Sequence, residues 1–301
     1  MKHVVSISLG ASNRDHRVQE TFGGDTVLIE RRGTDGDKEK ARQLIRELDG
    51  QVDAFGMGGT DLYIVAGKRR YTFRESAALA ACAVKTPIVD GSGLKNTLER
   101  RVVRYLTEKC GWHLAGRRAL IVCAVDRFGL AEALTQAGCK TVFGDLMFGL
   151  GLPFPIRTLR GLDRLARLVA PIITKCPVSW FYPIGAEQFK RQPKFTKYFV
   201  ESDIVAGDFH FIRRYMPDDM TGKIIITNTV TAEDKKMLSK AGVEWLVTTT
   251  PEFNGRSFGT NVLEAVLVAL SGEHAKQLTP QAYIRLLDEW NICPRVEKLS
   301  E

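Results

Sequence analysis

The sequence lacks several motifs that identify a site directly. It contains no G-x-G-x-x-G dinucleotide loop and no Walker A loop for nucleotide phosphates. Its six cysteines include no C-x-x-C pair, and no two of its five histidines have the spacing of metal ligands. The sequence therefore predicts no metal site and no disulfide framework. The cysteines are interpreted as reduced residues of the core.

Long apolar runs are also missing. Charged residues interrupt every apolar stretch well before 18 residues, which predicts no transmembrane helix. The N-terminus enters a strand-like segment within its first five residues, which is too early for a signal peptide. Together with the reduced cysteines, these features predict a cytoplasmic protein.

The composition is that of an ordinary globular protein. The chain has 301 residues, of which 44% are hydrophobic and 26% are charged, and its formal net charge is +8. This length suffices for two domains. The positive charge is spread along the chain without a basic tail, which argues against nucleic acid and favours a small anionic substrate or cofactor.

Strand-like and helix-like segments alternate along the chain, which predicts an α/β fold with mostly parallel sheets. Strands are predicted at 3–9, 26–30, 52–56, 61–66, 87–89, 119–125, 141–144, 203–206, 223–227 and 244–249. Helices are predicted between them and at 280–290. We expect an N-terminal α/β substrate-type domain (1–112), a Rossmann-like doubly wound domain (113–275), and a C-terminal helix and tail (276–301).

An unusual phosphate loop is predicted after the apolar strand 119–125. Asp126 and Arg127 lie in the turn, and Gly129 would let the backbone approach a cofactor closely. Asp145 follows Asp126 by 19 residues, close to the spacing at which dinucleotide-binding folds hold a ribose hydroxyl. This spacing slightly favours NAD over NADP.

Polar residues also follow the other predicted strands. Asn228 and Thr249 extend the rim on which a cofactor would bind, because ligands of open α/β sheets bind beyond the carboxyl ends of the strands. The competing interpretation is that each such residue only caps the helix that follows.

Candidate catalytic and anion-binding residues lie in glycine-bearing loops. Lys95 and Asp90, five residues apart across a glycine turn, are a candidate acid/base pair. The residues expected to bind substrate or an anion are Arg14, Asn96, Arg256 and Ser257. The alternative is that Lys95 is a solvated helix residue, that Asp90 caps its turn, and that the loop around Ser257 is an ordinary turn.

Segment 146–193 has a distinct composition. It contains a helix-like stretch in which Arg157, Arg160, Arg164 and Arg167 share one face, with leucines on the other. Three interpretations stay open: a helix packed on its own domain, a lid or homodimer contact, and a helix on a membrane surface.

Several stretches carry a resemblance to a known family. Residues 34–37, 53–59, 90–101, 207–217 and 255–264 resemble bacterial proteins labelled quinate 5-dehydrogenase. The order of the segments resembles the shikimate/quinate dehydrogenases, which have a substrate domain, a nicotinamide-binding Rossmann domain and a closing helix. This resemblance implies NAD or NADP as cofactor.

The resulting prediction is an NAD(P)-dependent oxidoreductase. Its substrate would be a small polar hydroxy acid, anionic and similar to quinate or shikimate, bound in the cleft between the domains. Two alternatives stay open because the phosphate loop is atypical. One is a non-redox protein that binds a nucleotide or metabolite, and the other is a non-redox enzyme on the same fold.

Overall fold

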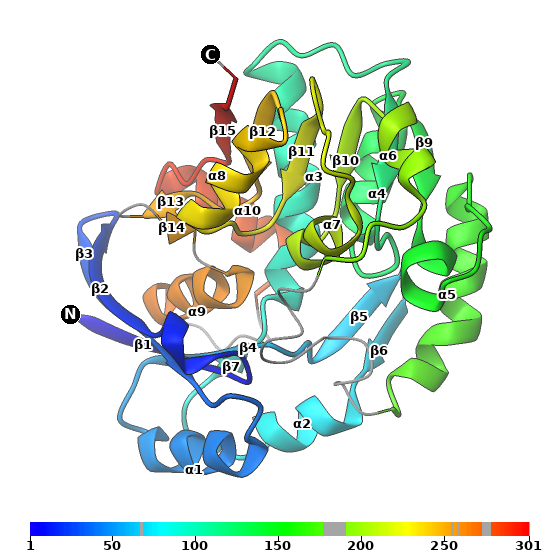
Figure 1. The fold of residues 1–301 in the computed structure, drawn as a ribbon. Coiled ribbons are helices and arrows are strands. Elements are labelled where there is room, and N and C mark those ends of the chain that lie inside the picture. Colours follow the sequence, from blue (N-terminus) through cyan, green and yellow to red (C-terminus); the bar gives the residue numbers. More distant parts are fainter. Residues whose placement is uncertain (67–68, 177–190, 254–255, 258, 273–277, 301) are drawn as a thin grey trace.

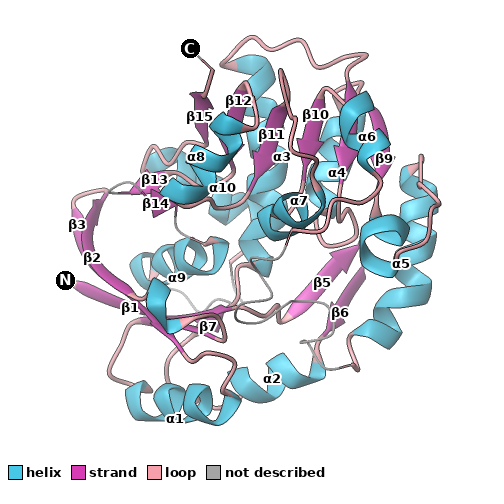
Figure 2. Cartoon of the chain, in the orientation of Figure 1, coloured by secondary structure: helices cyan, strands magenta, loops and turns pink. Residues whose placement is uncertain are grey.

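The computed structural model describes the chain except for residues 67–68, 177–190, 254–255, 258, 273–277 and 301. Its two halves are α/β domains, each built around a largely parallel sheet, as the alternation of strands and helices predicted (Figure 1). Helices flank both sheets (Figure 2). Within the described part of the chain, no helix combines the length and apolar character needed to cross a membrane.

The first sheet has the order β2-β3-β1-β4-β7. Its strands are β1 (Lys2–Ser8), β2 (His16–Phe22), β3 (Asp25–Gly33), β4 (Ala54–Gly58) and β7 (Ile88–Val89). Only β2, at the edge, is antiparallel to its neighbour. The last five residues of β1 are buried without alternation, as in a central strand covered on both faces. Helices α1 (Lys38–Leu48) and α2 (Arg74–Ala80) belong to this half.

The second sheet has the order β15-β12-β11-β10-β8-β9. Its parallel strands are β8 (Arg118–Ile121), β9 (Lys140–Phe143), β10 (Ile204–Ala206), β11 (Ile224–Thr227) and β12 (Trp245–Thr248). Strand β15 (Arg295–Lys298) closes the edge antiparallel to β12. The helices between these strands are α4 (Phe128–Gln136), α5 (Leu159–Ile173), α6 (Thr196–Glu201), α7 (Phe209–Tyr215) and α8 (Ala232–Lys240).

Three further helices tie the halves together. Helix α3 (Ser92–Glu108) packs on α4 and on α9 (Thr260–Ser271), and α10 (Pro280–Glu289) packs on α3. Although α9 follows the parallel strands of the second sheet in sequence, its apolar residues join the core of the first sheet beside Val4 and Ala54. In the opposite direction, β15 comes from the C-terminal tail and extends the second sheet. The chain therefore crosses between the halves more often than its segment order indicated.

The structure corrects several predicted segments. The strand predicted at 119–125 ends at Ile121, because the backbone N–H groups of Ala124 and Val125 donate to Asp145 instead of continuing the ladder. The sequence analysis also missed β2, β15, α6 and β6 (Arg69–Thr72), which pairs with β5 (Tyr63–Ala66). These elements are short or rich in polar residues, so their hydrophobic periodicity is weak.

Candidate functional site

Loops at the carboxyl ends of strands from both sheets meet at one group of charged side chains. Asp61 follows β4 of the first sheet, while Asp126 and Arg127 follow β8 and Asp208 follows β10 of the second. Helix α3 contributes Lys95 and Glu99. We call these six residues, Asp61, Lys95, Glu99, Asp126, Arg127 and Asp208, the charged cluster. Their side chains are between 1% and 14% exposed.

The position of the charged cluster follows from the strand order. In the first sheet the chain passes from β1 to β3 on one side and later to β4 on the other side. The second sheet repeats this arrangement, with β9 on one side of β8 and β10 on the other. At such a reversal the two flanking loops diverge and leave a crevice beyond the carboxyl ends of the strands. Asp61 lies beyond one reversal, and Asp126 and Asp208 lie beyond the other.

Lys95 joins the two halves of the charged cluster. Its Nζ lies 2.8 Å from Asp126 Oδ1 and 3.5 Å from Asp61 Oδ1. Burial alone would lower the pKa of Lys95, but the carboxylates of Asp126 and Asp61 outweigh it and raise that pKa. Lys95 is therefore held as a cation. Its ion-pair partners are these two aspartates and not Asp90, and the acid/base role of Lys95 and Asp90 stays a prediction.

Arg127 holds the second half of the charged cluster. Its Nη2 lies 2.9 Å from Asp208 Oδ2, its Nη1 lies 3.2 Å from Glu99 Oε1, and its Nε lies 3.4 Å from Asp126 Oδ2. Burial raises the pKa of Glu99, although Arg127 opposes that shift. Burial would also raise the pKa of Asp208, but Arg127 reverses this and the pKa is lowered. Arg127 thus links α3 to the loops after β8 and β10.

Neighbouring polar residues fix these loops. Asn228, after β11, donates from its side-chain amide to Asp208 Oδ2 at 2.8 Å. The backbone N–H of Thr249, after β12, donates to Thr227, and Thr249 is buried. Asn228 therefore supports the charged cluster directly, whereas Thr249 holds β12 beside β11.

Gly129 and Asn96 serve the packing of two helices. The backbone N–H of Gly129 donates to Asn96 Oδ1 at 3.0 Å. A Cβ atom at Gly129 would lie 2.9 Å from the carbonyl oxygen of Asn96, so only glycine allows α4 to approach α3 this closely. The structure thus assigns Gly129 to contact with α3, where the sequence suggested contact with a cofactor.

Both carboxylate oxygens of Asp145 are bonded to the chain's own backbone. Oδ1 accepts from the N–H of Val125 at 2.8 Å, and Oδ2 accepts from the N–H of Ala124 at 3.2 Å. Burial raises the pKa of Asp145 to about 6. The side chain thus shapes the turn that presents Asp126, and the expected ribose contact stays a prediction.

Asp90 belongs to a second buried polar group. Its carboxylate accepts from the backbone N–H of Leu62 and from the hydroxyl of Ser92. Burial raises the pKa of Asp90 and also raises the pKa of nearby Glu264 to about 8. The hydroxyl of Tyr283 donates to Glu264. This group fixes the start of α3 against α9, so it positions Lys95 through the backbone.

Of the other predicted anion-binding residues, Arg14 lies in the first half of the protein, and the remaining two lie outside the described side chains. Arg14 is half-buried in a short 3-10 helix, η1 (Ser12–Arg14), in the loop after β1. Arg256 and Ser257 form β14 (Arg256–Ser257), which pairs with β13 (Glu252–Phe253), and their side chains lie outside the description, as do residues 254–255 and 258. The segment 255–259 also spells G-x-S-x-G, the pattern of a nucleophile elbow. That motif needs a serine on a strand-to-helix turn, whereas Ser257 lies within a paired strand.

The sequence analysis did not select Asp61, Glu99 or Asp208. Two of them carried a usable signal, because Asp61 ends a glycine-rich loop after a predicted strand and Asp208 directly follows another. Glu99 carried none, since it is one of several charged residues along a helix and its partner Arg127 lies 28 residues away.

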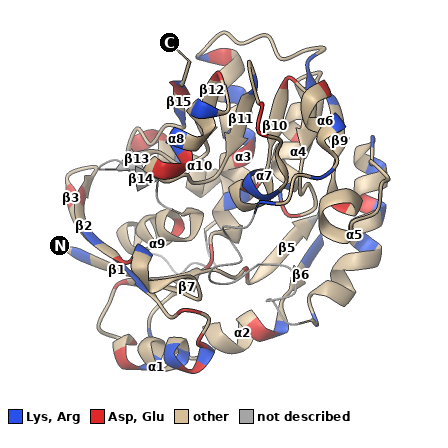
Figure 3. Cartoon of the chain, viewed as in Figure 1, with Lys and Arg blue, Asp and Glu red and all other residues tan. Residues whose placement is uncertain are grey.

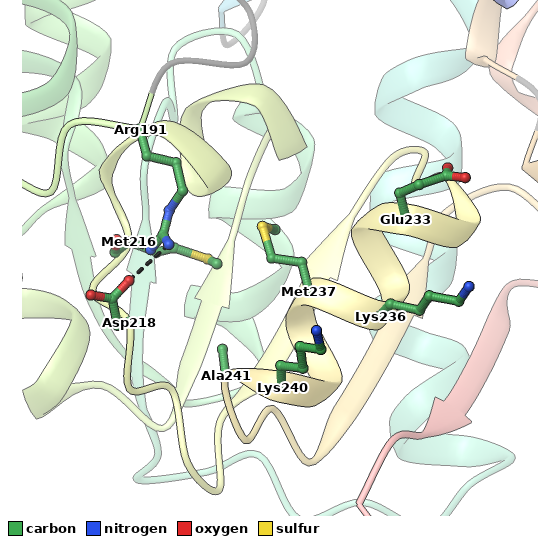
Figure 4. Close-up of a pocket in the computed structure, with 8 residues that line it drawn as sticks. All are labelled: Arg191, Met216, Asp218, Glu233, Lys236, Met237, Lys240 and Ala241. Carbon is green, nitrogen blue, oxygen red and sulfur yellow. Dashed lines mark hydrogen bonds and ion pairs between the residues drawn. The ribbon is translucent and has the colours of Figure 1, made fainter.

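A surface groove of about 450 Å³ lies between α8 and the segment that follows α7 (Figure 4). It is lined by Arg191, Met216, Asp218, Glu233, Lys236, Met237, Lys240 and Ala241. Arg191 is held by Asp218 at 2.8 Å, and the lysines extend along exposed α8. This groove contains none of the residues at the carboxyl ends of the strands, so we place the candidate site at the charged cluster.

Solved structures with a remote likeness include binding proteins and an NAD-dependent malic enzyme. They include a galactofuranose binding protein (12% identity, 97% of this chain and 99% of that chain, TM-score 0.35). A second is the periplasmic binding protein of an arabinose ABC transporter from Shewanella sp. ANA-3 (11% identity, 99% of this chain and 92% of that chain, TM-score 0.38). A third is an NAD-dependent malic enzyme from Thermotoga maritima (11% identity, 96% of this chain and 83% of that chain, TM-score 0.38). No curated protein matches the chain.

Two family models match, and they correct the family resemblance inferred from the sequence. Residues 3–90 match "Domain of unknown function (DUF8753)", and residues 93–299 match "Domain of unknown function (DUF8754)". Neither is described as a quinate or shikimate dehydrogenase family, so that resemblance is wrong. The predicted NAD(P)-dependent oxidoreductase function, which this resemblance implied, is corrected with it. Since the second model spans more than half of the sequence, the chain belongs to the family described as domain of unknown function DUF8754.

Proposed function

We propose that this protein binds a small polar metabolite, without redox chemistry, in the crevice between its two sheets. One observation carries the proposal: loops from the carboxyl edges of both sheets converge on the charged cluster. Ligands of open α/β sheets bind at this edge, where the strand order reverses. We infer that the second sheet is doubly wound, with its reversal between β8 and β10.

The charges indicate which ligands fit. The charged cluster contains four carboxylates and two cations, so its excess charge is negative. An anion about 4 Å from one of these carboxylates would be repelled by about 4 kcal/mol at an effective dielectric constant near 20. Hydroxyl and ammonium groups, in contrast, donate hydrogen bonds to carboxylates. We therefore expect a neutral or cationic ligand that carries hydroxyl or amino groups.

Binding requires the charged cluster to open, because its side chains are paired with one another. The pair between Lys95 and Asp61, at 3.5 Å, is the longest of these ion pairs. This pair also joins the loop of the first sheet to the rest of the cluster. We expect a ligand to replace Lys95 as the partner of Asp61.

Calorimetric titration with a compound panel tests the proposal. The panel contains neutral monosaccharides and polyols, amino sugars, quinate, NAD⁺ and NADP⁺, so it also tests the cofactor predicted from the sequence. We expect binding of a neutral or amino-bearing compound that Asp61→Asn weakens by at least about tenfold, since a charged hydrogen bond contributes about 1.5–3 kcal/mol. Asp163→Asn is the matched control, because Asp163 pairs with Arg167 on α5, far along the chain from the charged cluster.

Two results would contradict the proposal. One is binding confined to quinate or the nicotinamide nucleotides, and the other is binding that Asp61→Asn and Asp126→Asn both leave unchanged. NMR spectra of a bound compound before and after incubation then separate the remaining alternatives. An unaltered compound supports a binding protein, and a converted one indicates a non-redox enzyme at the same site.

A further inference from the structure

We propose that α5 and the loop before it form a docking surface for an anionic lipid bilayer. This surface, called the α5 patch, consists of the exposed side chains of residues 150–175. It is separate from the charged cluster and from the proposed ligand crevice. Helix α5 lies at the edge of the molecule, with basic residues along it (Figure 3).

The exposed residues of α5 form one continuous stripe. Arg160, Arg164, Arg167, Leu168 and Ile172 follow one another at spacings that keep them on one face of a helix, and all five are exposed. The residues that α5 buries, Leu162, Ala166 and Ala170, lie on the opposite face. The helix is therefore anchored to the protein by its small apolar side, and the stripe faces solvent.

Exposed apolar side chains concentrate in the α5 patch. Among the described residues, eight large hydrophobic side chains are exposed, and five of them are Leu150, Leu152, Phe154, Leu168 and Ile172. Leu168 is 72% exposed, and Phe154 is 61% exposed. Isolated apolar residues on a surface need no explanation, but a concentration of this kind marks an interaction surface.

Positive charge concentrates in the same place. Residues 157–175 contain five basic residues and one acidic residue, so this short segment accounts for half of the chain's net charge of +8. Asp163, the acidic residue, pairs with Arg167. Arg157, Arg160, Arg164 and Lys175 are all exposed.

An anionic bilayer uses both properties of the α5 patch. Leucine, isoleucine and phenylalanine side chains can enter the boundary of the acyl chains, while arginines bind lipid phosphates at the same depth. A second copy of the chain fits less well, because a twofold interface would place this arginine row against itself. Nucleic acid would pair with the arginines but would leave the exposed aliphatic side chains without a partner.

Vesicle co-sedimentation tests the α5 patch. We expect the full chain to sediment with vesicles of phosphatidylcholine containing about 30% phosphatidylglycerol, and not with phosphatidylcholine alone. Raising the salt from about 0.1 M to about 1 M should release it, because the Debye length falls from about 10 Å to about 3 Å.

Two paired variants locate the binding surface. Arg160→Gln with Arg164→Gln should lower the partition coefficient by about 30-fold, since each basic residue near an anionic surface contributes about 1 kcal/mol. Leu168→Ser with Ile172→Ser should lower it by at least about tenfold. The matched control is Lys236→Gln with Lys240→Gln, which removes two exposed cations from α8 and should leave partitioning unchanged. All substituted residues are exposed, and circular dichroism verifies that each variant is folded.

Three results would overturn the proposal. The first is no sedimentation with anionic vesicles at low salt, and the second is an equal loss of binding in the α8 control. The third is that light scattering shows a dimer, that Leu168→Ser with Ile172→Ser dissociates this dimer, and that the natural chain does not bind vesicles. That result would identify a second copy of the chain as the occupant of the α5 patch.

Discussion

Replacement of Arg127 by methionine should destabilise the protein strongly. The Arg127 side chain is 7% exposed and contacts the carboxylates of Glu99, Asp208 and Asp126 at 3.2, 2.9 and 3.4 Å. Methionine fills much of the volume but supplies no charge and no donor. The three carboxylates would then face one another, and Lys95 would be the remaining cation of the charged cluster.

The size of the effect follows from burial. Removal of one partner from a buried ion pair costs about 3–5 kcal/mol, because the remaining charge stays desolvated. Glu99 is the partner most affected, since its side chain is 1% exposed. We therefore expect Arg127→Met to lower the free energy of unfolding by about 3–5 kcal/mol at neutral pH.

The effect should depend on pH. Burial already raises the pKa of Glu99, and loss of Arg127 removes an interaction that opposes this shift, so the pKa rises further. The native variant would then bind more protons than its unfolded state, and its stability would fall as pH rises. The difference in the free energy of unfolding between Arg127→Met and the natural chain should be largest at about pH 8 and should shrink toward about pH 5.

Urea unfolding monitored by circular dichroism measures this difference. Arg118→Met is the matched control, because the pair of Arg118 with Asp203 is 56% and 39% exposed and spans 3.6 Å. An exposed ion pair of this kind contributes no more than about 1 kcal/mol to the free energy of unfolding. A loss below about 1 kcal/mol for Arg127→Met, or a loss that does not vary with pH, would refute the reasoning.

Two further substitutions probe the group that fixes α3 against α9. Burial raises the pKa of Glu264 from 4.5 to about 8, so the natural chain should lose stability as pH rises through this interval. Glu264→Gln should make that slope shallower without removing it, because Asp145 has a pKa raised to about 6 and also contributes. Thermal unfolding midpoints across the interval would detect the change. Gly91→Ala should lower the free energy of unfolding, measured in urea, by at least about 3 kcal/mol. Gly91 has φ +93°, and a Cβ atom added there would lie 2.6 Å from the backbone nitrogen of Asn261. Gly222→Ala, with φ +69° and open space among the described residues, should cost only about 1 kcal/mol.

The incorrect prediction of a dehydrogenase shows how the order of strands and helices in a sequence can mislead. The sequence has alternating strands and helices, a long helix near residue 100 and a closing helix. This order resembles that of a dehydrogenase, but it occurs in many other α/β proteins. Activity resides in particular side chains and their geometry rather than in that order. Asp145 illustrates the point: its spacing from Asp126 matched a ribose contact, but its carboxylate accepts from the backbone of residues 124 and 125.

The sequence by itself determined most of the secondary structure and part of the site. Apolar runs such as 119–122 and the periodicity of α1 and α5 are local patterns, and local patterns are enough to predict strands and helices. The residues after the strands, including Asp126 and Arg127, could likewise be placed at the ligand-binding edge.

Only the tertiary structure decided which of these residues meet. Lys95 lies 34 residues from Asp61 and 31 from Asp126, and Arg127 lies 81 residues from Asp208. The tertiary structure also decided that α9 packs on the first sheet and that β15 joins the second. These pairings depend on how two sheets and α3 pack together, and a charged residue carries no local signal that identifies a distant partner.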